Sequence, residues 1–176
     1  WATIRNNYNL SDFSASTPVE CDAIRAVRTK SESVNNFKFL LIEKSFNKRY
    51  ELRLDIARFY PTIYTHGIPW AILGKEKAKR YFVQKTSRST TWNTIVAADP
   101  NAAIYDFCDK LDLLVRNCQE RQSIGVPIGP DVFFILAEVI ANRIDNEIAT
   151  KLTGLDYTAT RYYDDYYFYT NTYNDA

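Results

Sequence analysis

The spacing of apolar residues predicts two long helices in the second half of the chain. Across residues 102–118, apolar side chains recur three and four positions apart, as they do on one face of a helix. Residues 131–152 repeat this period, and at about 1.5 Å per residue such a helix spans roughly 30 Å. A helix of that length with an apolar face is expected to lie in the core.

Four shorter stretches have the pattern of β-strands. Residues 36–43 and 50–56 are rich in aromatic and β-branched side chains and are separated by a polar stretch, so they predict two strands that are compatible with a hairpin. Residues 158–163 and 166–170 are rich in aromatic side chains and are joined through an Asp-Asp dipeptide. These two stretches predict a second pair of strands.

The middle of the chain gives less regular signals. Residues 62–73 follow Pro61, whose fixed φ suits the first turn of a helix. Because this stretch also contains Gly67 and Pro69, we expect its helix to be short or kinked. Residues 125–130 form a Gly/Pro-rich loop before the second long helix.

Composition is that of a folded, globular domain. The chain has 176 residues, 46% of them hydrophobic, which is enough for a proper core. Lys and Arg total 22 and Asp and Glu total 21, so only a local patch would attract a nucleic acid. With no long apolar run and no signal-like start, we expect a cytoplasmic protein. The chain begins with Trp1 and lacks methionine, so we interpret it as a piece of a longer protein.

A zinc site built from cysteine and histidine is not expected. Cys21, Cys108 and Cys118 have no CxxC spacing, and His66, the one histidine, is interpreted as structural. Cys108 and Cys118 fall within one predicted helix, too far apart for a local bridge, so we expect reduced thiols.

Carboxylates stand at the ends of predicted strands. Asp164 and Asp165 have Arg161 as the one cation close in sequence, and like charges about 4 Å apart repel by about 4 kcal/mol at an effective dielectric near 20. Asp55 lies at the end of another apolar strand. Each is also an ordinary turn residue, and this alternative stays open for the dipeptide alone. On neighbouring strands, the three carboxylates would share two cations about 3.5–4 Å apart, as phosphoryl transfer requires.

Three motifs, in the right order, resemble those of reverse transcriptases. Residues 55–61 (Asp-Ile-Ala-Arg-Phe-Tyr-Pro) resemble motif A of that family, residues 125–130 (Gly-Val-Pro-Ile-Gly-Pro) its motif B loop, and residues 162–165 (Tyr-Tyr-Asp-Asp) its Y-x-D-D motif C. Residues 59–71, together with this loop, are most similar to the bacterial abortive-infection and defence-associated group. The resemblance covers roughly residues 50–170.

The resemblance implies a set of metal ligands. Asp55 and Asp164 would be the main ligands of two Mg²⁺ ions, for which Mn²⁺ is a possible substitute. The backbone carbonyl of Ile56 would be a further ligand, and Asp165 an auxiliary carboxylate. The remaining ligands would be phosphates and water.

The resemblance also implies contacts to an incoming deoxynucleoside triphosphate. Phe59 and Tyr60 of motif A would lie at the nucleotide, where the bulky Tyr60 ring leaves no room for a 2′-hydroxyl. The alternative for Tyr60 is a core aromatic. Pro127, Ile128 and Gly129 would floor the pocket, although many reverse transcriptases have Gln where Ile128 stands. The alternative for this loop is a simple connection between two helices.

The basic segment is the candidate contact to a template or primer. Residues 75–88 hold six Lys and Arg with only Glu76 opposing them, and Tyr81 and Phe82 lie among them. Such a segment would follow a nucleic-acid backbone with salt-dependent affinity, whereas a solvated helix face is an equal alternative. The candidate contacts are Lys75, Lys79, Arg80, Lys85 and Arg88.

The resemblance implies an α+β polymerase palm, in which an antiparallel sheet carries the three aspartates and is backed by the two long helices. Residues 1–45 would form part of the fingers, and residues 46–176 the palm, with a fingers or basic insertion near residues 74–98. The thumb would be absent from this chain.

The function that the resemblance implies is RNA-directed DNA synthesis. The partners would be an RNA template, a DNA or RNA primer and deoxynucleoside triphosphates, with a role in antiphage defence suggested by the subgroup. The alternatives are an RNA-dependent RNA polymerase and a palm-like nucleic-acid-binding module that does not synthesise. No membrane contact is expected, and the oligomeric state is not predicted.

Overall fold

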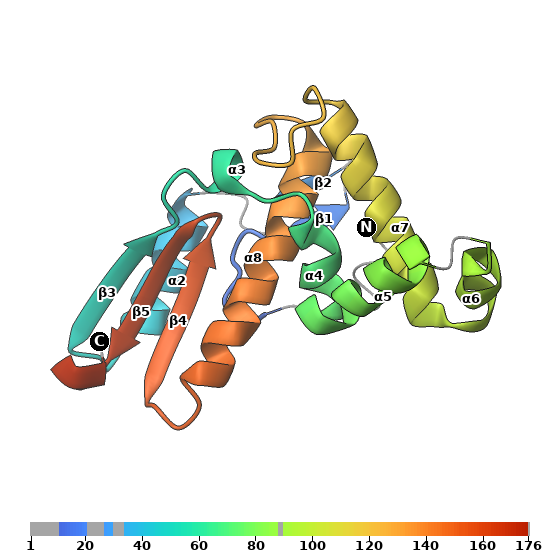
Figure 1. Ribbon diagram of the computed structural model, residues 1–176. Coiled ribbons are helices and arrows are strands. Elements are labelled where there is room, and N and C mark those ends of the chain that lie inside the picture. Colours follow the sequence, from blue (N-terminus) through green and yellow to red (C-terminus); the bar gives the residue numbers. More distant parts are fainter. Residues whose placement is uncertain (1–10, 21–26, 30–33, 88–89, 176) are drawn as a thin grey trace. The chain divides into compact units, whose positions relative to one another are not determined.

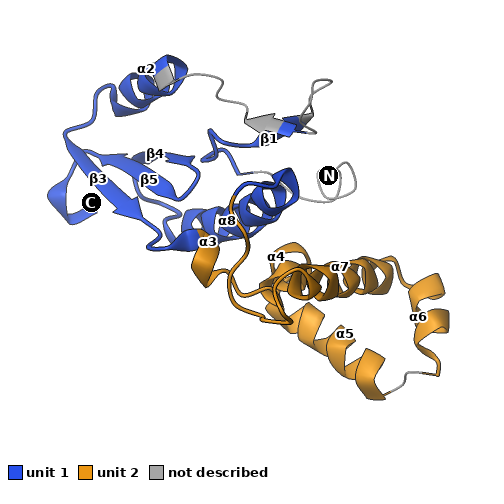
Figure 2. Cartoon of the chain, turned by 90° about the horizontal axis from the view of Figure 1, so that it is seen from above, with its two compact units in different colours: residues 1–59, 129–176 blue, residues 60–128 orange. Residues whose placement is uncertain are grey.

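The computed structural model describes residues 11–20, 27–29, 34–87 and 90–175. The chain divides into two units by packing: unit 1 comprises residues 1–59 and 129–176, and unit 2 comprises residues 60–128 (Figure 2). The predicted fingers and palm are functional regions of a polymerase, and a division by packing does not test them. They stay predictions.

Unit 1 contains a three-stranded antiparallel sheet with the order β3-β5-β4 (Figure 1). Its strands are β3 (Tyr50–Asp55), β4 (Tyr157–Tyr162) and β5 (Asp165–Thr170). The central strand is β5, which pairs antiparallel with β3 on one side and with β4 on the other. The predicted α+β class with an antiparallel sheet is therefore confirmed.

A long helix and a shorter one pack against the sheet of unit 1. The long helix is α8 (Asp131–Lys151), whose Ile144 and Ile148 pack in one apolar cluster with Phe168 of β5. The shorter helix is α2 (Val34–Ser45), whose Phe37 ring stacks on Tyr162 at 4.6 Å. Phe168 and Tyr167 are successive on β5, and Phe37 also meets Tyr167 edge-on at 5.5 Å, so the two helices contact opposite sides of the strand.

The N-terminal part of unit 1 adds backbone pairing beside β4. Ala15 donates its N–H to the Arg161 carbonyl (N to O 2.7 Å), and Arg161 donates its N–H to the Phe13 carbonyl (2.6 Å). A separate two-stranded sheet joins β1 (Pro18–Glu20) to β2 (Val27–Thr29). The chain described ends in a short 3-10 helix, η1 (Tyr173–Asp175).

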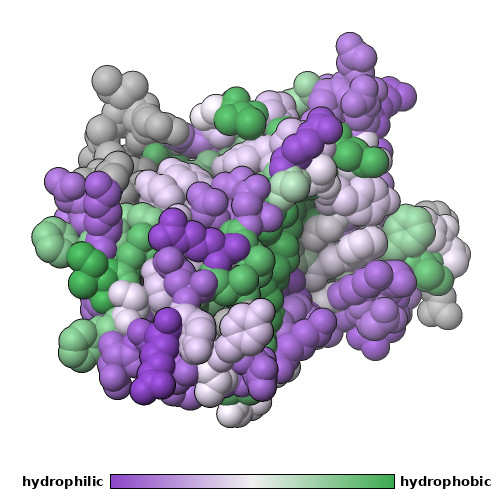
Figure 3. All heavy atoms as spheres, turned by 90° about the vertical axis from the view of Figure 1, so that its left-hand side faces the viewer, coloured by the Kyte–Doolittle hydropathy of each residue, from purple (hydrophilic) through white to green (hydrophobic). Residues whose placement is uncertain are grey.

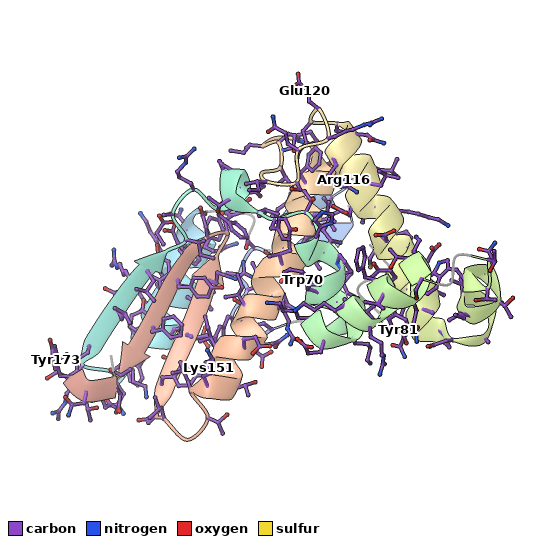
Figure 4. The ribbon with its side chains drawn as sticks, viewed as in Figure 1. Trp70, Tyr81, Arg116, Glu120, Lys151 and Tyr173 are labelled. Atoms are coloured by element: carbon purple, nitrogen blue, oxygen red, sulfur yellow. The ribbon has the colours of Figure 1, made fainter. Side chains whose placement is uncertain are left out.

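Unit 2 is helical. Its core is a cluster of aromatic and small side chains that includes Tyr81, Trp92 and Tyr105; Tyr81 is labelled in Figure 4. Asp99 starts the longest helix of this unit by accepting the N–H of Asn101 (2.9 Å), and it also accepts the Tyr81 hydroxyl (2.6 Å). The helices are α3 (Phe59–Thr62, which begins at the end of unit 1), α4 (Gly67–Leu73), α5 (Lys75–Ser87), α6 (Trp92–Ala98) and α7 (Pro100–Asn117).

The strand predicted over residues 36–43 is wrong, because this stretch belongs to α2. Burial recurs at positions 37, 40, 41 and 44, which is a helical period, but exposed Phe39 (70%) and Ile42 (63%) hide that period in the sequence. The hairpin between residues 36–43 and 50–56 is wrong for the same reason. Figure 3, in which the left-hand side of Figure 1 faces the viewer, shows hydrophobic surface between hydrophilic side chains.

The other predicted elements lie close to their expected places. The helix predicted over residues 102–118 begins two residues earlier, at Pro100, and the one over 131–152 ends one residue earlier. Residues 62–73 do not form one helix, since α3 and α4 are separate short helices with Thr65 between them. Cys108 and Cys118 are free thiols, whereas Cys21 lies outside the described residues. Within the described residues, no helix is long and apolar enough to span a membrane.

Candidate active site

The sheet register brings the predicted carboxylates together at one end of the sheet in unit 1. Asp55, the last residue of β3, is the partner of Asp165, the first residue of β5. The pairing continues one step further, because Ile56 donates its N–H to the Asp164 carbonyl (N to O 3.2 Å). Figure 1 shows the end of β3 beside the turn between β4 and β5. All three aspartates therefore lie at the same end of the sheet.

The turn that carries Asp164 has an uncommon backbone. It comprises Tyr163 and Asp164, and Tyr163 has a φ of 56°, a region that residues other than glycine rarely adopt. Two-residue hairpins favour such positive φ values because they match the twist of the strands. Tyr163 donates its N–H to Ser16 Oγ (2.9 Å) and accepts Arg161 Nη1 at its carbonyl (2.7 Å). These contacts hold the strained turn in place.

The electrostatics of the site favour a bound cation. Partial desolvation of its carboxyl group, together with the negative charges of Asp164 and Asp55, raises the pKa of Asp165 above the ordinary value of an aspartic acid. These neighbouring negative charges repel one another, and a divalent cation would offset that repulsion directly.

The three carboxylates suit a magnesium site whose coordination is completed by water or substrate. Among the described residues, no three His, Cys, Asp or Glu side chains are grouped as a ready-made metal cage. Mg²⁺ usually keeps several waters and takes one or two carboxylates plus substrate phosphates, rather than a complete protein cage. Asp55, Asp164 and Asp165 supply hard oxygen donors of that kind, and Asp55 and Asp165 are exposed. The carbonyl of Ile56 stays a predicted ligand.

The nucleotide contacts predicted in motif A are the first two residues of α3. Phe59 is buried (6% exposed) and belongs to unit 1, whereas Tyr60 is half-buried and belongs to unit 2. The Tyr60 carbonyl accepts the N–H of Val126 (3.0 Å), and the Ile63 carbonyl accepts that of Gly125 (2.7 Å). Within unit 2, the end of motif A is thus hydrogen-bonded to the start of the motif B loop.

The predicted contacts in the motif B loop are exposed. Ile128 is 74% exposed, and Pro127 and Gly129 are also at the surface. Gly125 has a φ of 90°, and a Cβ placed there would lie 3.2 Å from the Pro61 carbonyl oxygen. The close approach of these two chain segments therefore requires glycine at position 125.

The basic segment forms α5, and its cations have different surroundings. Lys75 lies over the ring of Trp70, Lys79 is exposed at 4.0 Å from Glu76, and Arg80 lies over Tyr81. These contacts leave the charges at the surface of unit 2. Arg88 lies outside the described residues.

Lys85 differs from Lys75, Lys79 and Arg80 because its charge is paired inside unit 2. Its Nζ lies 2.9 Å from Asp106 Oδ1 and 2.7 Å from Asp109 Oδ2, and the side chain is 29% exposed. Burial opposes the charge, but hydrogen bonds to these two carboxylates outweigh it and raise the pKa of Lys85. Asp106 also accepts the indole N–H of Trp92 (2.8 Å). Lys85 thus joins α5 to α7.

Two polar clusters were not identified from the sequence. In unit 2, His66 Nδ1 lies 2.7 Å from Oδ2 of the buried Asp112, and Nε of Arg116 (labelled in Figure 4) lies 3.3 Å from the same oxygen. In unit 1, Arg161 is fully buried against acidic residues of α8. The signal in the sequence is a charged residue on the apolar side of a helix or strand.

No family model matches the sequence, and no curated protein matches it.

Proposed function

We propose that this protein is an RNA-directed DNA polymerase whose active site contains Asp55, Asp164 and Asp165. The observation that carries the proposal is the pairing of Asp55 with Asp165 at the end of adjacent strands, with Asp164 in the turn next to them. This arrangement joins two sequence segments about 110 residues apart, and both resemble catalytic motifs of reverse transcriptases.

The proposed reaction is nucleotidyl transfer. The primer 3′-hydroxyl loses its proton to water, and its oxygen attacks the α-phosphorus of a deoxynucleoside triphosphate. A new P–O bond forms, and the bond to the bridging oxygen breaks so that pyrophosphate leaves. Two Mg²⁺ ions, when bound, would stabilise the negative charge on the attacking and leaving oxygens. Asp55 and Asp164 would hold these ions, and Asp165 and the Ile56 carbonyl would be additional ligands. Mn²⁺ is expected to substitute for Mg²⁺.

The other predicted contacts have supporting roles in this proposal. Tyr60 excludes the 2′-hydroxyl of a ribonucleotide, and the exposed loop at Pro127, Ile128 and Gly129 contacts the incoming nucleotide. The surface cations of α5, namely Lys75, Lys79 and Arg80, bind the phosphates of an RNA template or its primer. Lys85 is left out of this role, because Asp106 and Asp109 already balance its charge.

Primer extension on an RNA template tests the proposal. Asp164→Asn keeps the size of the side chain but removes a charge from the site, so extension should fall by about 10³-fold or more. Asp156→Asn is the matched control, because Asp156 lies beyond the opposite end of the same sheet and is exposed, paired with Lys48. The control should extend primers at the wild-type rate.

Each result separates the proposal from an alternative. Equal incorporation by wild type and Asp164→Asn would contradict the catalytic assignment. Preference for ribonucleotides would indicate an RNA polymerase instead. Nucleic-acid binding without incorporation, on several templates and primers, would indicate a module that does not synthesise.

A further inference from the structure

A buried polar cluster lies on the α8 side of the β4–β5 hairpin. Arg161 of β4 is fully buried (0% exposed), and it faces two acidic residues of α8, Glu138 (4%) and Asp145 (0%). These two lie seven positions apart, so about two helical turns place them on one side of α8. Buried charges are costly unless each one is paired and hydrogen-bonded. The fold is therefore expected to keep the contacts between these three side chains.

Arg161 uses its entire donor capacity within unit 1. A guanidinium has five N–H donors in a fixed plane. Nε and Nη2 donate to the two oxygens of Asp145 (both 2.9 Å), and Nη2 and Nη1 donate to the two oxygens of Glu138 (2.8 and 3.0 Å). The remaining Nη1 hydrogen goes to the Tyr163 carbonyl (2.7 Å). Lysine, with three donors and no plane, would not reproduce this set.

The same cluster fixes the backbone on the N-terminal side of the Asp-Asp pair. Tyr163, which directly precedes Asp164, has a φ of 56° and accepts Arg161 at its carbonyl. Its N–H is donated to Ser16 Oγ (2.9 Å), and Ser16 in turn donates to Glu138 Oε2 (3.3 Å). Both the N–H and the carbonyl of a strained residue are therefore tied to one network.

The C-terminal side of the pair is anchored to the same helix. Tyr166, which directly follows Asp165, is buried and donates its hydroxyl to Asp145 Oδ1 (2.6 Å). Asp164 and Asp165 thus lie between two residues that are both bonded to the same buried network on α8. A rotation of the turn would break several hydrogen bonds of that network together, and each such bond is costly to break.

We propose that Arg161, Ser16, Glu138, Asp145 and Tyr166 form a positioning cluster that fixes Asp164 and Asp165 in the orientation in which they share a cation with Asp55. The inference rests on the proposed function, because it takes these aspartates to be metal ligands. None of the five residues is itself a ligand. They act by setting the conformation of the turn, so their removal should lower metal affinity and not only thermal stability.

Mn²⁺ binding by the 176-residue chain, followed by electron paramagnetic resonance of the free ion, tests the inference. Ser16→Ala is the main variant, because it removes the bond to the Tyr163 N–H without leaving a buried charge unpaired. We expect Mn²⁺ affinity to fall about five-fold, the effect of removing one hydrogen bond, with circular dichroism showing a folded protein. Tyr166→Phe should change affinity in the same direction, and Arg161→Lys should do so more strongly.

Ser45→Ala is the matched control, since Ser45 Oγ donates a local hydrogen bond to the Ile42 carbonyl of α2, away from the Asp-Asp turn. It should bind Mn²⁺ as the wild type does. If Ser16→Ala and Tyr166→Phe lower the melting temperature but bind Mn²⁺ with wild-type affinity, the cluster has only a structural role and the inference is overturned. If the wild type itself binds no Mn²⁺, the proposed function fails, and the inference fails with it.

Discussion

Asp165 shows at the scale of single residues how the site opposes the stability of the fold. Partial desolvation of its carboxyl group and the charges of Asp164 and Asp55 raise its pKa, so the folded protein holds this proton more tightly than the unfolded chain does. Its contribution is therefore most favourable below the pKa of the unfolded chain and is lost as the pH rises through the folded pKa. Above the folded pKa and without metal, the ionised Asp165 destabilises the folded state.

Asp165→Asn should consequently raise the melting temperature at pH 7 in the absence of divalent cations. The gain should disappear as the pH falls below the ordinary pKa of an aspartic acid, and it should shrink when Mg²⁺ is added, because a cation relieves the same repulsion. Thermal unfolding followed by circular dichroism at several pH values, with and without Mg²⁺, measures both effects.

Asp156→Asn provides a control of opposite sign. Hydrogen bonds from Lys48 and Asn171 lower the pKa of Asp156, so its ionised form stabilises the fold above the unfolded pKa. The variant should melt slightly lower than the wild type at pH 7, and the effect should be small because the side chain is exposed (73%). Equal shifts in both variants would contradict the electrostatic explanation.

Tyr60→Ala tests the proposed selection against ribonucleotides. Removal of the ring should open space for a 2′-hydroxyl and raise ribonucleotide incorporation relative to deoxynucleotide by about ten-fold or more, as for other steric pockets. Competition between the two nucleotide types in primer extension measures the ratio. Tyr173→Ala, at a 78% exposed position, is the control and should leave the ratio unchanged. An unchanged ratio for Tyr60→Ala would favour a core role for this ring.

At the scale of elements, the pairing between the segment after β3 and the motif B loop depends on one glycine. Gly125 has a φ of 90° and approaches the Pro61 carbonyl, so alanine would be strained in conformation and crowded in space. Gly125→Ala should lower the free energy of unfolding by about 1–3 kcal/mol. Denaturant unfolding measures this decrease.

Gly67→Ala is the matched control for that substitution. Gly67 begins α4, and a Cβ at this position meets no atom within 4 Å. Alanine should be neutral or stabilise here by up to about 1 kcal/mol, since it suits a helix better than glycine. A destabilisation at Gly67 equal to that at Gly125 would contradict the account of the loop.

The elements also show how far the sequence could lead. The period of 3.6 identified α7 and α8, and the two strands around Asp164 and Asp165 were identified from their aromatic pattern and the turn between them. The α2 segment was predicted as a strand, because apolar residues occupy its exposed positions as well as its buried ones. The pairing of β3 with β5 and not with β4 was not predictable, since it is determined by packing between segments more than 100 residues apart in sequence.

The candidate site was predictable only for groups that a motif marks. Asp55, Asp164 and Asp165 stand at strand ends, where the sequence alone separates them from core residues. Nothing local in the sequence showed that Lys85 would pair with Asp106 and Asp109. The same is true of Arg161, because its carboxylate partners come from a helix 16 and 23 residues away.

At the scale of the whole molecule, a net charge of +1 makes the proposed binding of nucleic acid depend on the surface of α5. Replacing Lys75, Lys79 and Arg80 together by glutamine should weaken binding to a primer–template. It should also reduce the slope of log affinity against log salt by about 0.7–0.9 for each phosphate that the protein no longer neutralises. Fluorescence anisotropy at several salt concentrations measures both quantities.

A triple variant with the same change in net charge is the control for α5. Lys48, Lys110 and Arg143 are each paired with a carboxylate, and their replacement by glutamine should leave the salt slope close to that of the wild type. An equal decrease in affinity in both triple variants would indicate a dependence on total charge and would contradict a binding surface on α5.

The central claim is that Asp55 and the Asp164–Asp165 turn hold one divalent-metal site. Fe²⁺ in place of Mg²⁺, with ascorbate and peroxide, produces hydroxyl radicals that cut the backbone next to the bound ion. We predict cuts near residue 55 and near residues 164–165 in the same sample, suppressed by excess Mg²⁺ and abolished in Asp164→Asn. Cuts at only one of these places, cuts elsewhere, or an unchanged pattern in the variant would contradict the claim.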